Sequence, residues 1–288
     1  MKRIAILGCE NSHANAFLKC ISTMERYSDV EVVGVYSNDP AASQKLCDEF
    51  GVPVLQNYTD AVGKVDGLVI TARHGGNHYP YAAPYIANGI PMFIDKPITV
   101  SEDEAVTFMR ELKARGVRFC GGSSLKQADE IKALKAEALS GELGSTVGGY
   151  VRAPYQPNSE YGGFYFYAQH LVEMVCEIFG RFPLSVTARK NGDSLHVLFH
   201  YDEYDCVGLF CDHSHAYFAS RMSEKGTTSL AVVSSKDWYA REFDEFYTLL
   251  SGGEQTIDAR EFISPVFIMN AIERSIKSGR EEAITYRD

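Results

Sequence analysis

The sequence lacks the paired cysteines, the basic excess and the long apolar run that mark three common classes of protein. Its seven cysteines are scattered with no C-x-x-C pair, which argues against a disulfide framework or a zinc knuckle and fits a reducing cytoplasm. The net charge of −10 argues against a basic surface for nucleic acid. No apolar stretch approaches the roughly 18 residues that span a bilayer. We therefore expect a cytoplasmic protein with no nucleic-acid or membrane partner.

The length of 288 residues predicts two domains, because single domains usually hold roughly 100–200 residues. Strand and helix signals alternate over residues 1–120, which favours a parallel sheet that helices cover on both faces. The expected strands are 3–8, 31–36, 52–55, 67–71, 91–95 and 117–120, and the expected helices are 14–24, 41–50, 79–88 and 102–115.

The pattern changes after Gly121-Gly122, where consecutive strand signals replace the alternation. Such a run predicts a second, α+β domain with a mainly antiparallel sheet, so we expect domains at 1–122 and 123–288. The expected strands here are 148–152, 184–189, 194–201, 207–211, 216–220 and 229–233, and the expected helices are 127–139, 170–179, 239–250 and 263–278.

A charged pair, Asp95 and Lys96, stands where the expected strand 91–95 stops before Pro97. A proline cannot continue a central strand, so the pair lies at a strand end, where open α/β sheets bind their ligands. A lysine there can donate to a substrate hydroxyl and receive its proton if the site lowers its pKa. The alternative is a surface lysine before a turn.

The first strand-to-helix turn, from Gly8 to His13, stands where a dinucleotide fold places its phosphate loop. Of the glycines in G-x-G-x-x-G only Gly8 is present, since Glu10 and His13 take the second and third places. A carboxylate beside a pyrophosphate is repulsive unless it points away. Asn11 or Ser12 could cap the helix and leave backbone donors for a phosphate, and the alternative is a plain capped turn.

The ends of two further strands hold the other cofactor-side candidates. Ser37 and Asn38 take the places where an acid would select NAD, or where an arginine would accept the extra phosphate of NADP, and Asp39 lies slightly late. The choice between NAD and NADP therefore stays open. Thr71 and His78 flank a loop with two histidines and two glycines after the strand at 67–71, which is a plausible cofactor-side loop. The alternative is a set of merely solvated histidines.

Residues 160–170 are too aromatic and too rich in glycine for an ordinary loop. We expect His170 in the first turn of the helix at 170–179. The positive end of the helix dipole disfavours an imidazolium there, which would leave the ring neutral and ready to accept a proton.

Two groups of side chains could be interpreted as metal sites. Glu173 and Glu177 would share a helical face with His170, and alternation along a strand would put Cys211, His213 and His215 on one face. Neither group has an evident distant ligand. Solvated side chains explain both, and we expect no metal.

The order of these parts resembles the glucose–fructose oxidoreductase / inositol dehydrogenase (Gfo/Idh/MocA) family over nearly the whole chain. The resemblance is carried by Lys96 in the family's Glu-Lys-Pro motif, by His78, and by Gly162-Gly163 leading to His170. It implies an N-terminal Rossmann domain that binds NAD or NADP, and a C-terminal domain with a large open sheet that binds substrate. It also implies an oxidoreductase for sugars, polyols or related alcohols, assembled as a homodimer or homotetramer through that sheet.

The resemblance also implies roles for individual residues. Lys96 and His170 would serve the substrate, with Tyr167 as a further catalytic candidate, and His78 would lie on the nicotinamide side. The candidate cofactor-binding residues are Gly8, Glu10, Asn11, Ser12, His13, Ser37, Asn38, Thr71, His78, Asp95 and Lys96.

Two residues depart from the family pattern. Asp95 is one methylene shorter than the family's glutamate, and Phe166 replaces the aspartate four residues before the histidine. Without that aspartate, either Tyr167 or Tyr165 takes part or His170 works alone. Three interpretations therefore stand: an oxidoreductase that uses NAD or NADP, a catalytically degenerate ligand-binding or regulatory protein, and an enzyme that eliminates or epimerises with transient use of the cofactor.

Overall fold

The computed structural model describes residues 1–211, 214–233, 235 and 237–288, so His213 lies outside the described residues. The chain divides into two compact units. The first unit combines Met1–Gly122 with a later segment that contains helix α7 (Asp237–Leu250). The second unit holds the chain between these two parts and most of helix α8 (Ala259–Ser278).

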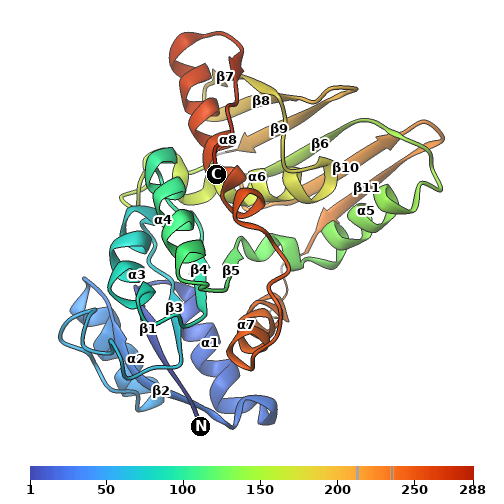
Figure 1. Cartoon of the computed structure of the whole chain (residues 1–288). Coiled ribbons are helices and arrows are strands. Elements are labelled where there is room, and N and C mark those ends of the chain that lie inside the picture. The colour runs from blue at the N-terminus through green and yellow to red at the C-terminus, as the bar shows by residue number, and fades with distance from the viewer. Residues whose placement is uncertain (212–213, 234, 236) are drawn as a thin grey trace. The chain divides into compact units, whose positions relative to one another are not determined.

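The first unit is built on a five-stranded parallel sheet in the order β2-β1-β3-β4-β5 (Figure 1). The chain leaves β1 toward one edge and later returns to its other side. The strand order therefore reverses at the carboxyl end of β1, which is where such sheets bind ligands. The strands are β1 (Lys2–Leu7), β2 (Val30–Tyr36), β3 (Gly67–Ile70), β4 (Met92–Asp95) and β5 (Phe119–Gly122).

Helices cover this sheet through buried aromatic side chains. Helices α1 and α7 pack on each other, with the rings of Phe17 and Phe243 5.3 Å apart, and Phe17 also contacts Phe93 of β4 edge-on. Helices α3 and α4 pack through Tyr79 and Phe108, on the other side of the sheet from α1 and α7 (Figure 1). The bounds are α1 (Ser12–Thr23), α2 (Pro40–Phe50), α3 (His78–Ile86) and α4 (Glu102–Ala114).

The second unit is built on a seven-stranded sheet in the order β11-β10-β6-β9-β8-β7-β12. Strands β6 and β9 are parallel and the other neighbours are antiparallel, so the sheet is mixed and mainly antiparallel. The strands are β6 (Thr146–Pro154), β7 (Ser185–Asn191), β8 (Ser194–His200), β9 (Asp205–Cys211), β10 (Tyr217–Ser223), β11 (Gly226–Val232) and β12 (Glu282–Ala283).

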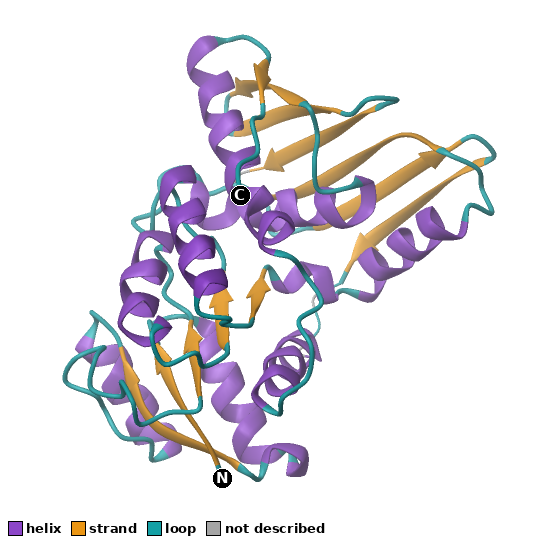
Figure 2. Cartoon of the chain, in the orientation of Figure 1, coloured by secondary structure: helices purple, strands orange, loops and turns teal. Residues whose placement is uncertain are grey.

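Helices α5 (Asp129–Ser140) and α6 (Tyr165–Phe179) pack on this second sheet, and α6 contacts both β6 and β9 (Figure 2). The strand register puts Tyr150, Val207 and Met222 together on one face of the sheet. Val207 and Met222 are 37% and 43% exposed. This face therefore carries apolar side chains that reach solvent.

The predicted fold class, an N-terminal Rossmann sheet followed by an α+β unit with a large, mainly antiparallel sheet, is confirmed. Two local predictions are wrong. Residues 52–55 form a single bridge, between Val35 and Val54, in place of a strand. Helix α6 begins at Tyr165, so His170 is its sixth residue and lies beyond the first turn, where the helix dipole is strongest.

Within the described residues, no helix is both long enough and apolar enough to cross a membrane.

Candidate functional site

The turn after β1 fits tightly against the end of β3. Gly8 has a φ of +78°, and a Cβ there would lie 2.3 Å from the backbone nitrogen of Ala72, so a larger residue is excluded twice over. The Thr71 hydroxyl donates to the Gly8 carbonyl over 3.1 Å. Gly8 thus allows the tight turn expected of the first glycine in a dinucleotide loop, and Thr71 holds the turn in place.

The N-terminus of α1 keeps its backbone donors available. Asn11, at the cap position, makes no side-chain hydrogen bond to the helix and instead donates to Asp95 over 2.8 Å. The first N–H groups of a helix have no partner within the helix, so they can bind an anion such as a phosphate. A pocket of about 500 Å³ adjoins this turn, lined by Cys9, Glu10, Asn11, Ser12, Asn15, Ala42, Lys45, Leu46, Glu49 and Arg73.

Glu10, the acid in place of the second motif glycine, is held at the ends of β2 and β3. Its carboxylate accepts from the Ser37 hydroxyl over 2.6 Å and from the Arg73 backbone N–H over 3.0 Å. Both oxygens are therefore engaged away from the start of α1, which removes the expected conflict with a pyrophosphate. Together with the turn at Gly8 and the uncapped helix, these residues fit a dinucleotide.

Ser37 and Asn38 follow β2, as the sequence predicts, but only the first is buried. The Ser37 hydroxyl accepts from the Asp39 backbone N–H over 3.0 Å while it donates to Glu10. Asn38 is exposed and accepts from the hydroxyl of Tyr36.

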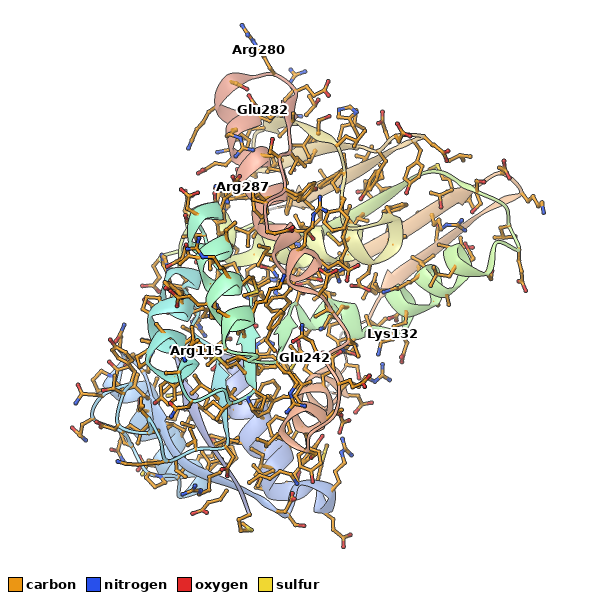
Figure 3. All side chains as sticks on the ribbon, viewed as in Figure 1. Arg115, Lys132, Glu242, Arg280, Glu282 and Arg287 are labelled. Carbon is orange, nitrogen blue, oxygen red and sulfur yellow. The ribbon has the colours of Figure 1, made fainter. Side chains whose placement is uncertain are left out.

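His13 lies in a buried cluster with two carboxylates. Its Nδ1 is 3.1 Å from Asp95 Oδ2 and its Nε2 is 3.3 Å from Glu242 Oε2, and all three side chains are at least 96% buried. Glu242, labelled in Figure 3, belongs to α7. The third motif position thus links α1 to the Asp95-Lys96 pair and to a helix from a distant part of the chain.

The protonation of this cluster follows from its burial. Burial lowers the pKa of His13 more than the nearby Asp95 raises it, and burial raises the pKa of Asp95 to about 6. A neutral imidazole donates from only one nitrogen, yet it faces two acids. Asp95 therefore takes up a proton at a higher pH than an aspartate in water does.

Lys96 is 4% exposed and stands directly after Asp95 at the end of β4. Its backbone N–H donates to the Asp95 carboxylate over 2.6 Å. Burial lowers the pKa of Lys96 below its ordinary value, and Arg73 lowers it further, while Asp95 and Glu242 raise it. A lysine in this setting can give up its proton and accept one from a hydroxyl more readily than a lysine in water.

His78 is fully buried at the start of α3. Its Nε2 is 2.8 Å from the Ala72 carbonyl and its Nδ1 is 3.2 Å from the Ile98 carbonyl, so the ring joins the loops after β3 and β4. Burial lowers its pKa to about 4, which keeps the ring neutral. The geometry gives His78 a supporting role beneath the loop of Lys96.

The lowered pKa of His78 predicts an acid sensitivity. Below the unfolded value of 6.5 the unfolded chain binds a proton that the native ring refuses until about pH 4, so stability falls over that range. Between pH 7 and pH 5, the unfolding free energy of the wild type should fall by on the order of 2 kcal/mol more than that of the His78→Gln variant. Urea unfolding at both pH values measures this difference. The raised pKa of Asp95 changes stability with pH in the opposite sense, but it does so in both proteins and cancels from the comparison. Equal falls in unfolding free energy for the two proteins would contradict the assignment.

In the second unit, His170 has a partner that the sequence did not suggest. Its Nδ1 is 2.7 Å from the hydroxyl of Ser123, which also accepts from the Leu125 backbone N–H. If Nδ1 carries the proton and donates to Ser123, the lone pair of Nε2 is left to act as a base. The ring of Tyr167 contacts the imidazole edge-on at 5.2 Å.

The neighbouring aromatic residues Tyr165 and Phe166 contact other side chains. The hydroxyl of Tyr165 donates to Asn270 and Glu273 of α8. Phe166 packs between the rings of Tyr161 and Tyr167. The Ser123 hydroxyl thus contacts His170 Nδ1, while Phe166 stands where the family pattern has an aspartate.

Glu173 and Glu177, which share the helix with His170, both accept from the guanidinium of Arg181. Among the described residues, no group of three His, Cys, Asp or Glu side chains is placed to hold a metal ion.

Three functional candidates emerge only from the structure: Arg73, Ser123 and Glu242. Ser123 directly follows the glycine pair at the domain boundary, and nothing local distinguishes it from a turn residue. Glu242 carried a usable signal, since it is an acid beside Phe243 and Phe246 on the buried side of an aromatic helix.

Comparison with known proteins identifies the first unit. Residues 2–123 match the sequence profile of an oxidoreductase family with an NAD-binding Rossmann fold, Gfo/Idh/MocA. The first unit is therefore similar to the NAD-binding part of this family. The predicted resemblance is thereby confirmed, and the family description agrees with the predicted nicotinamide cofactor.

Individual relatives are distant. The chain is 27% identical to inositol 2-dehydrogenase from Burkholderia vietnamiensis over 50% of this chain and 43% of the relative. It is 23% identical to glucose-6-phosphate 3-dehydrogenase from Bacillus subtilis over 55% of this chain and 43% of the relative. The chain thus spans less than half the length of these relatives.

Solved structures share the whole fold. A myo-inositol 2-dehydrogenase from Lactobacillus plantarum superimposes with a TM-score of 0.86 at 15% identity, covering 99% of both chains. A scyllo-inositol dehydrogenase from Lactobacillus casei with bound NAD(H) and scyllo-inositol gives 0.84 at 14% identity, covering 98% of this chain and 99% of the other. The fold therefore extends beyond the part matched by sequence.

Proposed function

We propose that the protein is an NAD- or NADP-dependent oxidoreductase that acts on a sugar, a polyol or a related alcohol. The observation that carries this proposal is Lys96, buried beside Asp95 at the carboxyl end of β4 in a Rossmann sheet. The turn at Gly8 and the uncapped start of α1 supply the phosphate-binding part. Relatives of the N-terminal unit bear the names of inositol and sugar-phosphate dehydrogenases, which suggests the substrate class.

The chain's own groups would move the proton while the bound nicotinamide supplies hydride chemistry. Lys96, with its lowered pKa, would accept the hydroxyl proton of the alcohol. His170 would hold or relay a proton through Nε2, with Ser123 fixing the ring through Nδ1. Tyr167, against the imidazole edge, would line the substrate site.

A second candidate function is a ligand-binding or regulatory protein on the same fold. It is favoured by Phe166, which packs among aromatic rings where the family pattern has an aspartate. Turnover of a nicotinamide dinucleotide separates the two candidates, because a regulator would bind without turning over.

Dinucleotide binding is the first test. We expect at least one of NAD, NADH, NADP and NADPH to raise the melting temperature, because a ligand that binds only the native state stabilises it by about 2.7 kcal/mol at a hundred times its Kd. Calorimetry should give a Kd for the same ligand. No binding of any of the four to folded protein would remove the proposal.

We also propose a cytoplasmic homo-oligomer that assembles through the sheet face of Tyr150, Val207 and Met222. All seven cysteines are free, as suits a reducing compartment. We expect sedimentation equilibrium to give a dimer or tetramer, and Val207→Lys with Met222→Lys to shift it toward monomer because charges would be buried. A monomeric wild type at micromolar concentration would contradict the proposal.

A further inference from the structure

We propose that Glu10 selects NAD over NADP by supplying, from the first loop, the carboxylate that reads the adenosine ribose. The inference rests on the proposed dinucleotide binding and adds the choice of cofactor to it. In Rossmann domains that prefer NAD, an acid at the end of the second strand accepts from the ribose 2′-hydroxyl. Here that strand end holds Ser37 and Asn38, so no acid stands at the usual place.

The structure brings a carboxylate to that strand end by another route. Glu10 Oε2 accepts from the Ser37 hydroxyl over 2.6 Å, so the acid reaches the end of β2 although it belongs to the loop after β1. The Asp39 backbone N–H donates to the same hydroxyl over 3.0 Å, which orients it toward Glu10. The Arg73 backbone N–H fixes the other oxygen over 3.0 Å.

The carboxylate retains capacity for a ligand. Two carboxylate oxygens offer about four acceptor sites, and the Ser37 and Arg73 donors use one on each oxygen. Glu10 is half-buried and lines the pocket of about 500 Å³ beside α1. A ribose hydroxyl could therefore donate to Glu10 with no movement of the acid.

The charge of Glu10 then discriminates between the cofactors. The 2′-phosphate of NADP would bring negative charge against a fixed carboxylate, whereas the 2′-hydroxyl of NAD would form a charge-assisted hydrogen bond. Lys45 and Arg73 line the same pocket and attract phosphate, but both cofactors carry a pyrophosphate. These cations would also attract the 2′-phosphate of NADP, so a preference for NAD requires that repulsion by the Glu10 carboxylate outweigh them.

The test compares Kd values for NAD and NADP by calorimetry in the wild type and in Glu10→Gln. The wild type should bind NAD at least tenfold more tightly than NADP, and Glu10→Gln should lower this ratio tenfold or more, chiefly by tightening NADP. Asp48→Asn is the matched control, because Asp48 is an exposed acid of α2 that accepts from the side chain of Gln44. It should leave the ratio unchanged.

A rescue variant separates a ribose contact from a general effect on the loop. Adding Ser37→Asp to Glu10→Gln places an acid at the usual strand end, and this should restore the preference for NAD. An unchanged ratio in Glu10→Gln overturns the inference, and so does an equal gain for both cofactors, which would make Glu10 a repeller of the pyrophosphate. If neither protein binds any dinucleotide, the proposed function itself fails.

Discussion

Replacing Lys96 with methionine should lower kcat for alcohol oxidation by roughly a hundred- to ten-thousandfold, the usual contribution of a general acid or base. Methionine keeps most of the apolar stem, which is 96% buried, and removes only the ammonium. Circular dichroism checks that the variant stays folded, because the buried Asp95 and Glu242 lose a neighbouring cation. Dinucleotide binding should be retained, since the phosphate-binding turn and α1 are untouched. Steady-state kinetics with a panel of inositols and hexoses measures the loss.

The pH profile adds an independent check on the same residue. Lys96 must be neutral to accept a proton, so oxidation by the wild type should accelerate as pH rises toward the lowered pKa of Lys96. Lys96→Met should lose this acceleration. Lys64→Met, at an exposed lysine of the same unit, should change neither rate nor profile. Near-normal turnover by folded Lys96→Met would show that another group carries the proton.

Much of the fold follows from local sequence patterns. The alternation of strand and helix signals predicts the parallel sheet. Each strand can be recognised as a short apolar run that ends at turn residues, as in Gly67–Ile70. Helix α7 was predicted as a helix, but its place on the first sheet was not. That place depends on long-range packing of Phe243 against Phe17 of α1 and of Phe246 beside Gly67 of β3, which no local pattern encodes.

Part of the candidate site also follows from local sequence patterns. Asp95 and Lys96 could be placed because a proline directly after an apolar strand fixes where the strand stops. Glu10 and Ser123 act through partners 27 and 47 residues away, and such pairs arise only when the strands assemble. The sequence predicts His78 as a loop histidine near the nicotinamide. Its full burial, which no local pattern reveals, places it as a support for the loop that carries Lys96. Residues expected to contact the substrate therefore cannot be distinguished by sequence pattern from the residues that position them.

The second large effect concerns His170. We expect His170→Asn to lower kcat by roughly a hundred- to ten-thousandfold, because asparagine can still bond the Ser123 hydroxyl but cannot take up a proton. The binding of NAD should be unchanged, since the dinucleotide elements belong to the first unit. His196→Asn, at an exposed position of β8, is the matched control and should leave kcat unchanged.

Ser123 allows the role of His170 to be resolved further. Ser123→Ala removes the hydroxyl at 2.7 Å from Nδ1, so the ring loses the contact that fixes its tautomer and orientation. We expect kcat to fall about tenfold, the lower limit for losing such a supporting contact, with KM little changed. The pH dependence of kcat should also shift, which a purely structural serine would not cause. Ser123→Thr keeps the hydroxyl and should restore both rate and profile.

If His170→Asn is inactive while Ser123→Ala matches the wild type at every pH, His170 works without Ser123. If His170→Asn retains full activity, the proton reaches the substrate through Lys96 alone.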